Sequence, residues 1–288
     1  MSVYRLCAFI VLLVGLPTSL VSAEETSPAA AKPITPTETI SLLGQGDLSQ
    51  HFYTWLTDGG YEDPRHVFTM GKDGILKISG DGFGGLITHQ EYADYYLVLE
   101  YRWGTETLLT RKGRARDGGL LLHCQGPDGG FGGSATKPGP WMTSIECQII
   151  EGGVGDILVL AGKDAAGKPL KASATCTIVR DRDGEAVWSP TGEATTFPKG
   201  RINWFGRDPN WKDVVDFRGP DDVESPGQEW TKLECFCVGD KLVYRVNGVV
   251  VNRASNVIPR QGKILLQTEG AEMYVRKAEI GPLPKEIP

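Results

Sequence analysis

The sequence lacks the positive charge that nucleic acids and anionic membranes require of a partner. Its 288 residues include 30 lysines and arginines against 36 aspartates and glutamates, which gives a formal net charge of −6. Both kinds of partner bind through a basic face, because their phosphate groups are negatively charged. We therefore expect neither nucleic acid nor membrane surface as a partner, whereas a small, neutral ligand fits.

Cysteine is scarce, and its spacing does not match a zinc site. The six cysteines form no C-x-x-C pair. Cys7 lies in an apolar leader, which leaves an odd number of five. Cys235 and Cys237 stand two apart in a predicted strand, so they point to the same face and are poorly placed to bridge each other. We predict that the five are mostly small core residues, with at most one disulfide among them.

Helical periodicity is also missing from the chain. Alternation of apolar and polar residues prevails instead, and the 37 glycines and 18 prolines favour many turns. About ten short strands bounded by turn signals predict an all-β sandwich or barrel. A long segment at about 180–228 is predicted to be a loop. The predicted strands are 74–80, 84–89, 95–103, 118–125, 144–150, 157–161, 231–238, 241–247, 262–268 and 272–280.

Three regions differ in composition. Residues 1–23 carry an early arginine, a short apolar run and the small residues Val-Ser-Ala at the end, which predicts a secretory signal peptide. The apolar run is too short to span a bilayer comfortably, so an uncleaved anchor is the weaker alternative and no transmembrane segment is expected after cleavage. Residues 24–39 predict a linker, and 40–288 a single β-sandwich domain. The mature protein is expected to be secreted or periplasmic.

Several predicted strands carry one apolar face and one polar face. The polar faces present Arg102, His123, Glu146, Gln148 and Gln267. For any single strand such a face is simply solvated. If these strands are neighbours in one sheet, however, the five side chains gather on a face turned away from the core. Arginine, histidine, glutamate and glutamine then favour a ligand-binding face.

The order of motifs along residues 40–283 resembles the 3-keto-disaccharide hydrolases, or 3-keto-glycoside lyases, also called domain of unknown function 1080. Asp117-Gly118 stands where that family has Asn-Ser. The other segments that carry the resemblance are Gln45–Ser49, Gly119–His123, Ser144–Ile149, Trp230, Asn247-Gly248, Leu266-Gln267 and Val275-Arg276. The resemblance implies a concanavalin A-like jelly roll of two antiparallel sheets with an open concave face. It also implies a sugar substrate and a separate sugar 3-oxidoreductase that supplies the ketone.

A ketone at C3 of a glycoside acidifies the proton at C2, and its removal allows the substituent at C1 to leave. This chemistry needs a base and an electrophile at the C3 oxygen. Glu146 or His123 is the candidate base. Arg102, or a divalent metal held by His123 and Glu146, is the candidate electrophile.

Four further residues are predicted to bind the sugar. Gln148 and Gln267 are expected to hydrogen-bond its hydroxyls. Trp141 and Trp204 are expected to stack on a ring.

Two other functions remain open. Glu146-x-Gln148-x-x-Glu151 resembles the Glu-x-Asp-x-x-Glu strand of retaining β-glucanases, although glutamine replaces the central aspartate. A polar concave face with tryptophan-bearing loops also suits a lectin-like module that binds carbohydrate without catalysis. The glycine-rich segment 129–133 lacks the strand and helix of a phosphate-binding loop, and we predict a flexible loop there.

Overall fold

The computed structural model describes residues 32–44, 46–134 and 136–288. The predicted signal peptide and the first half of the predicted linker lie outside these residues. The second half of the linker is described, and it is hydrogen-bonded to the domain. The Ile34 N–H donates to the Glu91 carbonyl over 2.8 Å, and the Ala93 N–H donates to the Ile34 carbonyl over 3.0 Å.

The strands of the described chain form two antiparallel sheets, which confirms the predicted all-β jelly-roll sandwich. The larger sheet consists of β1 (Ile40–Ser41), β3 (Phe68–Met70), β4 (Leu76–Ile78), β6 (Tyr95–Thr107), β10 (Ser173–Arg180), β11 (Ala186–Trp188), β12 (Glu193–Phe197), β14 (Thr231–Val238), β15 (Lys241–Val246), β16 (Val249–Ile258) and β18 (Ala271–Gly281). The smaller sheet consists of β2 (Phe52–Leu56), β5 (Phe83–Thr88), β7 (Asp117–Gln125), β8 (Thr143–Ile150), β9 (Ile157–Leu160), β13 (Gly200–Ile202) and β17 (Lys263–Glu269). Short 3-10 helices occur at Leu48–Gln50 and Leu109–Arg111.

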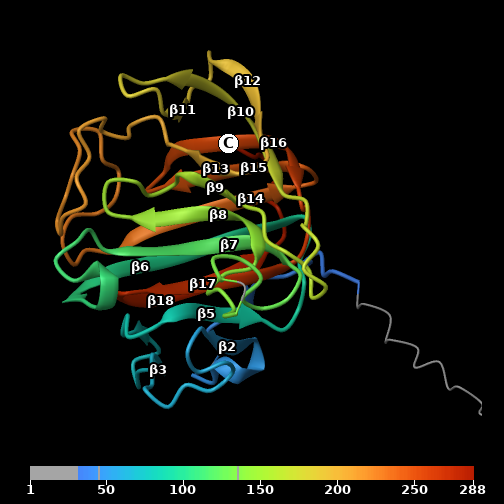
Figure 1. Ribbon diagram of the computed structural model, residues 1–288, viewed down its shortest axis with the longest axis vertical. Helices are drawn as coiled ribbons and strands as arrows, with labels where there is room; N and C mark the ends of the chain where they lie inside the picture. The colour runs from blue at the N-terminus through green and yellow to red at the C-terminus, as the bar shows by residue number, and fades with distance from the viewer. Residues whose placement is uncertain (1–31, 45, 135) are drawn as a thin grey trace, which may run out of the picture. The chain divides into compact units, whose positions relative to one another are not determined.

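The strand order of the smaller sheet is β13-β9-β8-β7-β17-β5-β2, so β8, β7 and β17 are direct neighbours (Figure 1). The register places Leu120 of β7 opposite Cys147 of β8 and opposite Leu266 of β17. All three side chains belong to the main hydrophobic core. Because side chains alternate across a strand, the residues next to them face the other side of the sheet.

The main core draws on strands of both sheets, and the cysteines lie in apolar surroundings as predicted. All five described cysteines are buried and unpaired. Cys147 of the smaller sheet and Cys235 of the larger sheet belong to the same core cluster, whereas Cys124 belongs to a smaller cluster with Trp141. No helix in the part of the chain that the structure describes has both the length and the apolar character needed to cross a membrane.

Each of the ten predicted strand segments overlaps an observed strand, but the predicted loop at 180–228 is only partly a loop. It contains β11, β12 and β13. β13 pairs with β9 at the edge of the smaller sheet, where Arg201 stands opposite Leu158. The pattern Gly-Arg-Ile is too short to show alternation, so only the pairing with β9 identifies this strand.

Candidate functional site

Three neighbouring strands of the smaller sheet direct polar side chains into one cavity of about 620 Å³. β7 supplies Asp117, and β8 supplies Glu146 and Gln148. β17 supplies Gln267 and Glu269. A cavity of this volume is in the range of small-molecule sites. Glu146, Gln148 and Gln267, three of the five side chains predicted from strand alternation to share a polar face, therefore line one cavity.

The walls of the cavity add apolar and cationic groups. Phe131 and Trp141 come from the segment between β7 and β8, and Leu158 comes from β9. Lys199 and Arg201 line the side formed by the chain around β13. Apolar walls with a few polar groups are typical of pockets that orient a small ligand.

Gly119 of β7 makes room for the polar groups of its neighbours. A Cβ atom at this position would lie 2.3 Å from Oε1 of both Glu146 and Gln267. Next to it, the Gln148 amide donates to Asp117 Oδ1 over 2.5 Å. The Gln267 Oε1 atom is buried and accepts no hydrogen bond from the described residues. It is therefore available to a protonated Glu146 or to a ligand hydroxyl.

The three carboxyl groups of the cavity hold their protons more strongly than usual. Burial, and then the charge of Asp117, raises the pKa of Glu146 to about 8, against the opposing effect of Arg201. Burial raises the pKa of Asp117 to about 6, although Arg111 and Arg201 oppose the shift. Burial, with Asp117 and Glu146 nearby, also raises the pKa of Glu269. At neutral pH the cavity therefore contains a protonated Glu146 beside an ionised Asp117.

A second buried group fixes Arg201 in the cavity wall. Asp156 Oδ2 accepts hydrogen bonds from Arg201 over 2.8 Å and from Arg207 over 2.9 Å. Its Oδ1 accepts the Trp204 N–H over 2.8 Å, and Asp156 is completely buried. Of the two arginines, only Arg201 lines the cavity. The ion pair with Asp156 thus holds the permanently charged Arg201 guanidinium in the wall of the cavity that contains the three carboxyl groups.

Four of the predicted site residues lie together in the cavity: Glu146, Gln148, Gln267 and Trp141. His123, Arg102 and Trp204 lie outside the cavity, each for a different physical reason.

His123 is turned into the core by a β-bulge. Its φ of 58° is left-handed, and the register between β7 and β8 shifts between Leu122 and Gln125. One extra residue in a strand reverses the alternation that follows. The His123 ring therefore packs edge-on against Tyr95, and its Nδ1 bonds the Pro259 carbonyl over 2.9 Å. Burial lowers its pKa to about 4, so the ring is neutral.

Arg102 lies on the larger sheet, whereas the strands of the cavity belong to the smaller sheet. Its strand, β6, pairs with β14 and β18 in the larger sheet. Its guanidinium packs on Tyr274 and Trp230, with 4.6 and 5.3 Å to the ring centroids, and donates to Gln228. Alternation along β6 correctly separated Arg102 from the core, but alternation does not show to which sheet a strand belongs.

Trp204 is a core residue and not a sugar-stacking one. Its side chain is 1% exposed, and its Nε1 donates to the Gly152 carbonyl over 3.2 Å.

Glu151, the second of the two outer carboxylates of the glucanase-like pattern, forms an ion pair outside the cavity. It pairs with Arg116 over 2.5 Å and does not line the cavity. The two carboxylates of that pattern are therefore not assembled in one site.

His123 and Glu146 do not fit a shared metal ion. Glu146 lines the cavity, whereas His123 packs against the core residue Tyr95 with Nδ1 already hydrogen-bonded. No group of three or more histidine, cysteine, aspartate or glutamate side chains within residues 32–44, 46–134 and 136–288 is placed to hold a metal.

Three further residues of the cavity were not predicted as site residues from the sequence. Asp117 stands out in the sequence only as a departure from a family motif, although its position two residues before Gly119 places it on the concave face. Arg201 lies in the segment predicted to be a loop. Glu269 follows Gln267 at the spacing of two that marks the same face of a strand, which is the signal that could have found it.

We predict that Gly119→Ala moves the end of the Glu146 or Gln267 side chain by about 1 Å or more, because a Cβ 2.3 Å from an oxygen is far inside contact distance. A crystal structure of the variant tests this. The adjacent Gly118→Ala is the control, since its Cβ would come no closer than 3.1 Å to a neighbour, the flexible end of Met273. A structure of Gly119→Ala with both side chains unmoved would contradict the prediction.

Among solved structures, the chain is similar in fold to a glycosyl hydrolase candidate from Parabacteroides distasonis. The two are 14% identical over 86% of this chain and 94% of the other, with a TM-score of 0.45. It is also similar to the carbohydrate-binding module CBM66 from Bacillus subtilis, with 9% identity over 85% and 96% of the two chains and a TM-score of 0.38. LamAcat from Zobellia galactanivorans is 8% identical over 86% and 97%, with a TM-score of 0.41. No curated protein matches the chain.

The sequence also matches the model of one protein family, described as the 3-keto-alpha-glucoside-1,2-lyase-like domain. The match runs over residues 39–281, which includes every strand of the cavity. The chain therefore belongs to the family of 3-keto-alpha-glucoside-1,2-lyase-like domains, a carbohydrate-active family.

Proposed function

We propose that this protein cleaves the glycosidic bond of a 3-keto-glycoside by removing the proton at C2. The observation that carries the proposal is Glu146, a buried carboxyl with a pKa of about 8 that lines a sugar-sized cavity beside a fixed arginine. A carboxylate that binds its proton this strongly is a better base than an ordinary glutamate, and perturbed groups of this kind concentrate at active sites. Membership of the lyase-like family supports the same reaction.

In the proposed reaction, the Glu146 carboxylate takes the C2 proton and the electron pair of the C–H bond moves into an enolate across C2 and C3. The Arg201 guanidinium stabilises the negative charge on the C3 oxygen. The enolate then re-forms the ketone, a double bond forms between C1 and C2, and the bond from C1 to the leaving oxygen breaks. The protonated form of Glu269, whose pKa is raised by burial, donates a proton to that oxygen. Addition of water to the unsaturated product would complete a hydrolysis.

The groups around the base position the ring. Gln148 is held by Asp117, and the side-chain oxygen of Gln267 accepts no hydrogen bond from the described residues, so both amides suit sugar hydroxyls. Trp141 is nearly buried in the cavity wall and offers an apolar surface to a ring. Sugar recognition by an aromatic face and fixed amides is consistent with the usual composition of ligand pockets.

The decisive experiment offers the purified full chain a methyl glucoside and the matching methyl 3-keto-glucoside, each with and without a chelator. We expect cleavage of the keto compound alone. Cleavage of the unmodified glucoside would overturn the C2-proton mechanism. Binding of sugar without cleavage of either compound would favour the lectin-like alternative. Loss of activity with the chelator would show a metal requirement.

We predict that Glu146→Gln lowers kcat on the keto substrate by about 10²–10⁴-fold, the usual contribution of a general base. The wild-type kcat/KM should rise with pH through about 8, because Glu146 must lose its proton before it can accept another, and it should fall again at higher pH, where Glu269 loses the proton that it donates. Steady-state rates between pH 5 and 9.5 measure both effects. Glu100→Gln, on the larger sheet, is the control and should leave the rates unchanged. A wild-type profile without the rising limb below pH 8 would contradict the role of Glu146 as the base.

We predict that Arg201→Met lowers kcat by about 10²–10³-fold, because the enolate oxygen loses its cation. Arg207→Met is the matched control, since Arg207 also pairs with Asp156 but does not line the cavity. Each variant leaves one arginine on Asp156, and Arg207→Met also loses the contact of Arg207 with the Trp211 ring, so the control has the larger structural cost. Equal losses of kcat in the two variants, measured on correctly folded protein, would contradict a direct role of Arg201.

A further inference from the structure

A second cavity, of about 290 Å³, lies beside the site cavity that contains Glu146, and we call it the edge pocket. Lys199, Gly200 and Arg201 line both cavities, so the chain around β13 is their common wall. The other described lining residues of the edge pocket are Arg180, Glu185, Ala186, Phe197 and Asn203. A ligand that contacts Arg201 in the site cavity is therefore also next to the edge pocket.

Hydrogen bonds between β11 and the residue after β13 hold the edge pocket in shape. The Asn203 N–H donates to the Ala186 carbonyl, and the Trp188 N–H donates to the Asn203 carbonyl, each over 2.8 Å. The Asn203 side-chain amide donates to Glu185 Oε2 over 2.7 Å. β11 belongs to the larger sheet and β13 to the smaller one, so the pocket is formed where the edges of the two sheets meet (Figure 1).

The edge pocket gathers positive charge in a chain whose formal net charge is −6. Arg180, Lys199 and Arg201 line it, against the single carboxylate of Glu185. The Arg180 guanidinium donates to the Gly184 carbonyl over 3.0 Å, and within the described residues neither Arg180 nor Lys199 forms an ion pair. Cations that converge in one concave pocket with too few acidic partners favour an anionic ligand, because a carboxylate or sulfate compensates their charge.

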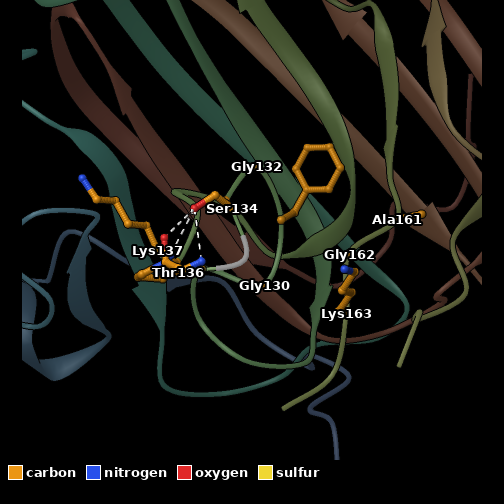
Figure 2. A pocket seen from close by; sticks show the side chains of 12 residues that line it. Gly130, Gly132, Ser134, Thr136, Lys137, Ala161, Gly162 and Lys163 are labelled. Atoms are coloured by element: carbon orange, nitrogen blue, oxygen red, sulfur yellow. Dashed lines mark hydrogen bonds between the residues drawn. The ribbon is translucent and has the colours of Figure 1, made fainter. Parts of the chain in front are cut away.

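A third cavity, of about 500 Å³, shares Phe131 and Ala161 with the site cavity, and we call it the loop pocket. It is lined by residues 129–134, 136–138 and 161–163. Its two lysines, Lys137 and Lys163, are exposed and lie on opposite sides of the pocket (Figure 2). Neither of them lines the site cavity. The cations of the loop pocket therefore do not converge as those of the edge pocket do.

We propose that the keto sugar cleaved by this protein is itself anionic, and that the edge pocket binds a carboxylate or sulfate group on the C4–C6 side of its ring. The inference rests on the proposed function, which places the C3 oxygen at Arg201. C4 follows C3 around the ring, on the side away from C1 and its leaving group. An anionic group carried there lies beyond Arg201, where Lys199 and Arg180 donate hydrogen bonds to it and compensate its charge.

The test measures kcat/KM of the full chain on three substrates: methyl 3-keto-glucoside, methyl 3-keto-glucuronide with its C6 carboxylate, and the 6-sulfate of methyl 3-keto-glucoside. We expect one of the two anionic substrates to be preferred over the neutral one by about tenfold or more, the usual effect of a charge-assisted hydrogen bond. The better anion identifies the natural group. Arg180→Gln should reduce the preference to about threefold or less and leave the rate on the neutral substrate within about twofold, since Arg180 does not line the site cavity.

Lys163→Gln is the matched control. It also removes one positive charge from an exposed side chain near the site cavity, but this side chain lines the loop pocket and not the edge pocket (Figure 2). The variant should keep the wild-type preference for the anionic substrate. Equal losses of that preference in Arg180→Gln and Lys163→Gln would show a general effect of charge and would overturn the edge pocket as the binding site.

The remaining outcomes separate this inference from the proposed function. If the wild type cleaves the neutral keto substrate as efficiently as both anionic ones, or if Arg180→Gln keeps the preference, only this inference fails. Equal losses on all three substrates in Arg180→Gln would also overturn it, since they would show a damaged fold or a role in the reaction itself. If the wild type cleaves none of the three, the proposed function fails, and this inference fails with it.

Discussion

The pairing of β7 with β8 and β17 is the constraint on which the candidate site depends. In this register Leu120 lies beside Cys147 and Leu266, and all three enter the core between the sheets. Strand alternation then obliges the intervening residues to face the cavity. The same contacts that bury the apolar side chains therefore collect the carboxyl and amide groups on the opposite face. A register slip of one residue would destroy the core and the site together.

The electrostatics of the site follow from how unevenly charge is distributed around this face. Three carboxyl groups share a cavity with one fixed guanidinium, that of Arg201. This guanidinium also pairs with the buried Asp156, which lies outside the cavity lining. Burial is the main cause that raises the pKa of Glu146 to about 8, the charge of Asp117 adds to it, and Arg201 opposes the shift without cancelling it. The raised pKa makes the group a stronger base than an ordinary glutamate once it is ionised.

The hairpin between β7 and β8 shapes one wall of the cavity. Its two mutual hydrogen bonds, between Phe131 and Trp141, fix an aromatic side chain in that wall. Its glycines allow the backbone to pass within distances that no side chain would permit. Loops held in this way on a sheet provide variable binding surfaces without disturbing the core.

The local alternation of apolar and polar residues determined much of this protein's structure. Alternation predicted the strands that carry Glu146, Gln148 and Gln267, the face on which they lie, and the apolar environment of the cysteines. It failed at His123, because a bulge adds one residue to β7 and reverses the direction of the side chain. It failed at Arg102 and Trp204, because alternation does not tell one sheet from the other or a loop that enters the core from one that covers it. Asp117, Arg201 and Glu269 join Glu146 only through long-range pairing, and the pKa of that carboxyl arises from their mutual burial. Local sequence thus decided which side chains leave the core, and only the tertiary structure decided which of them meet.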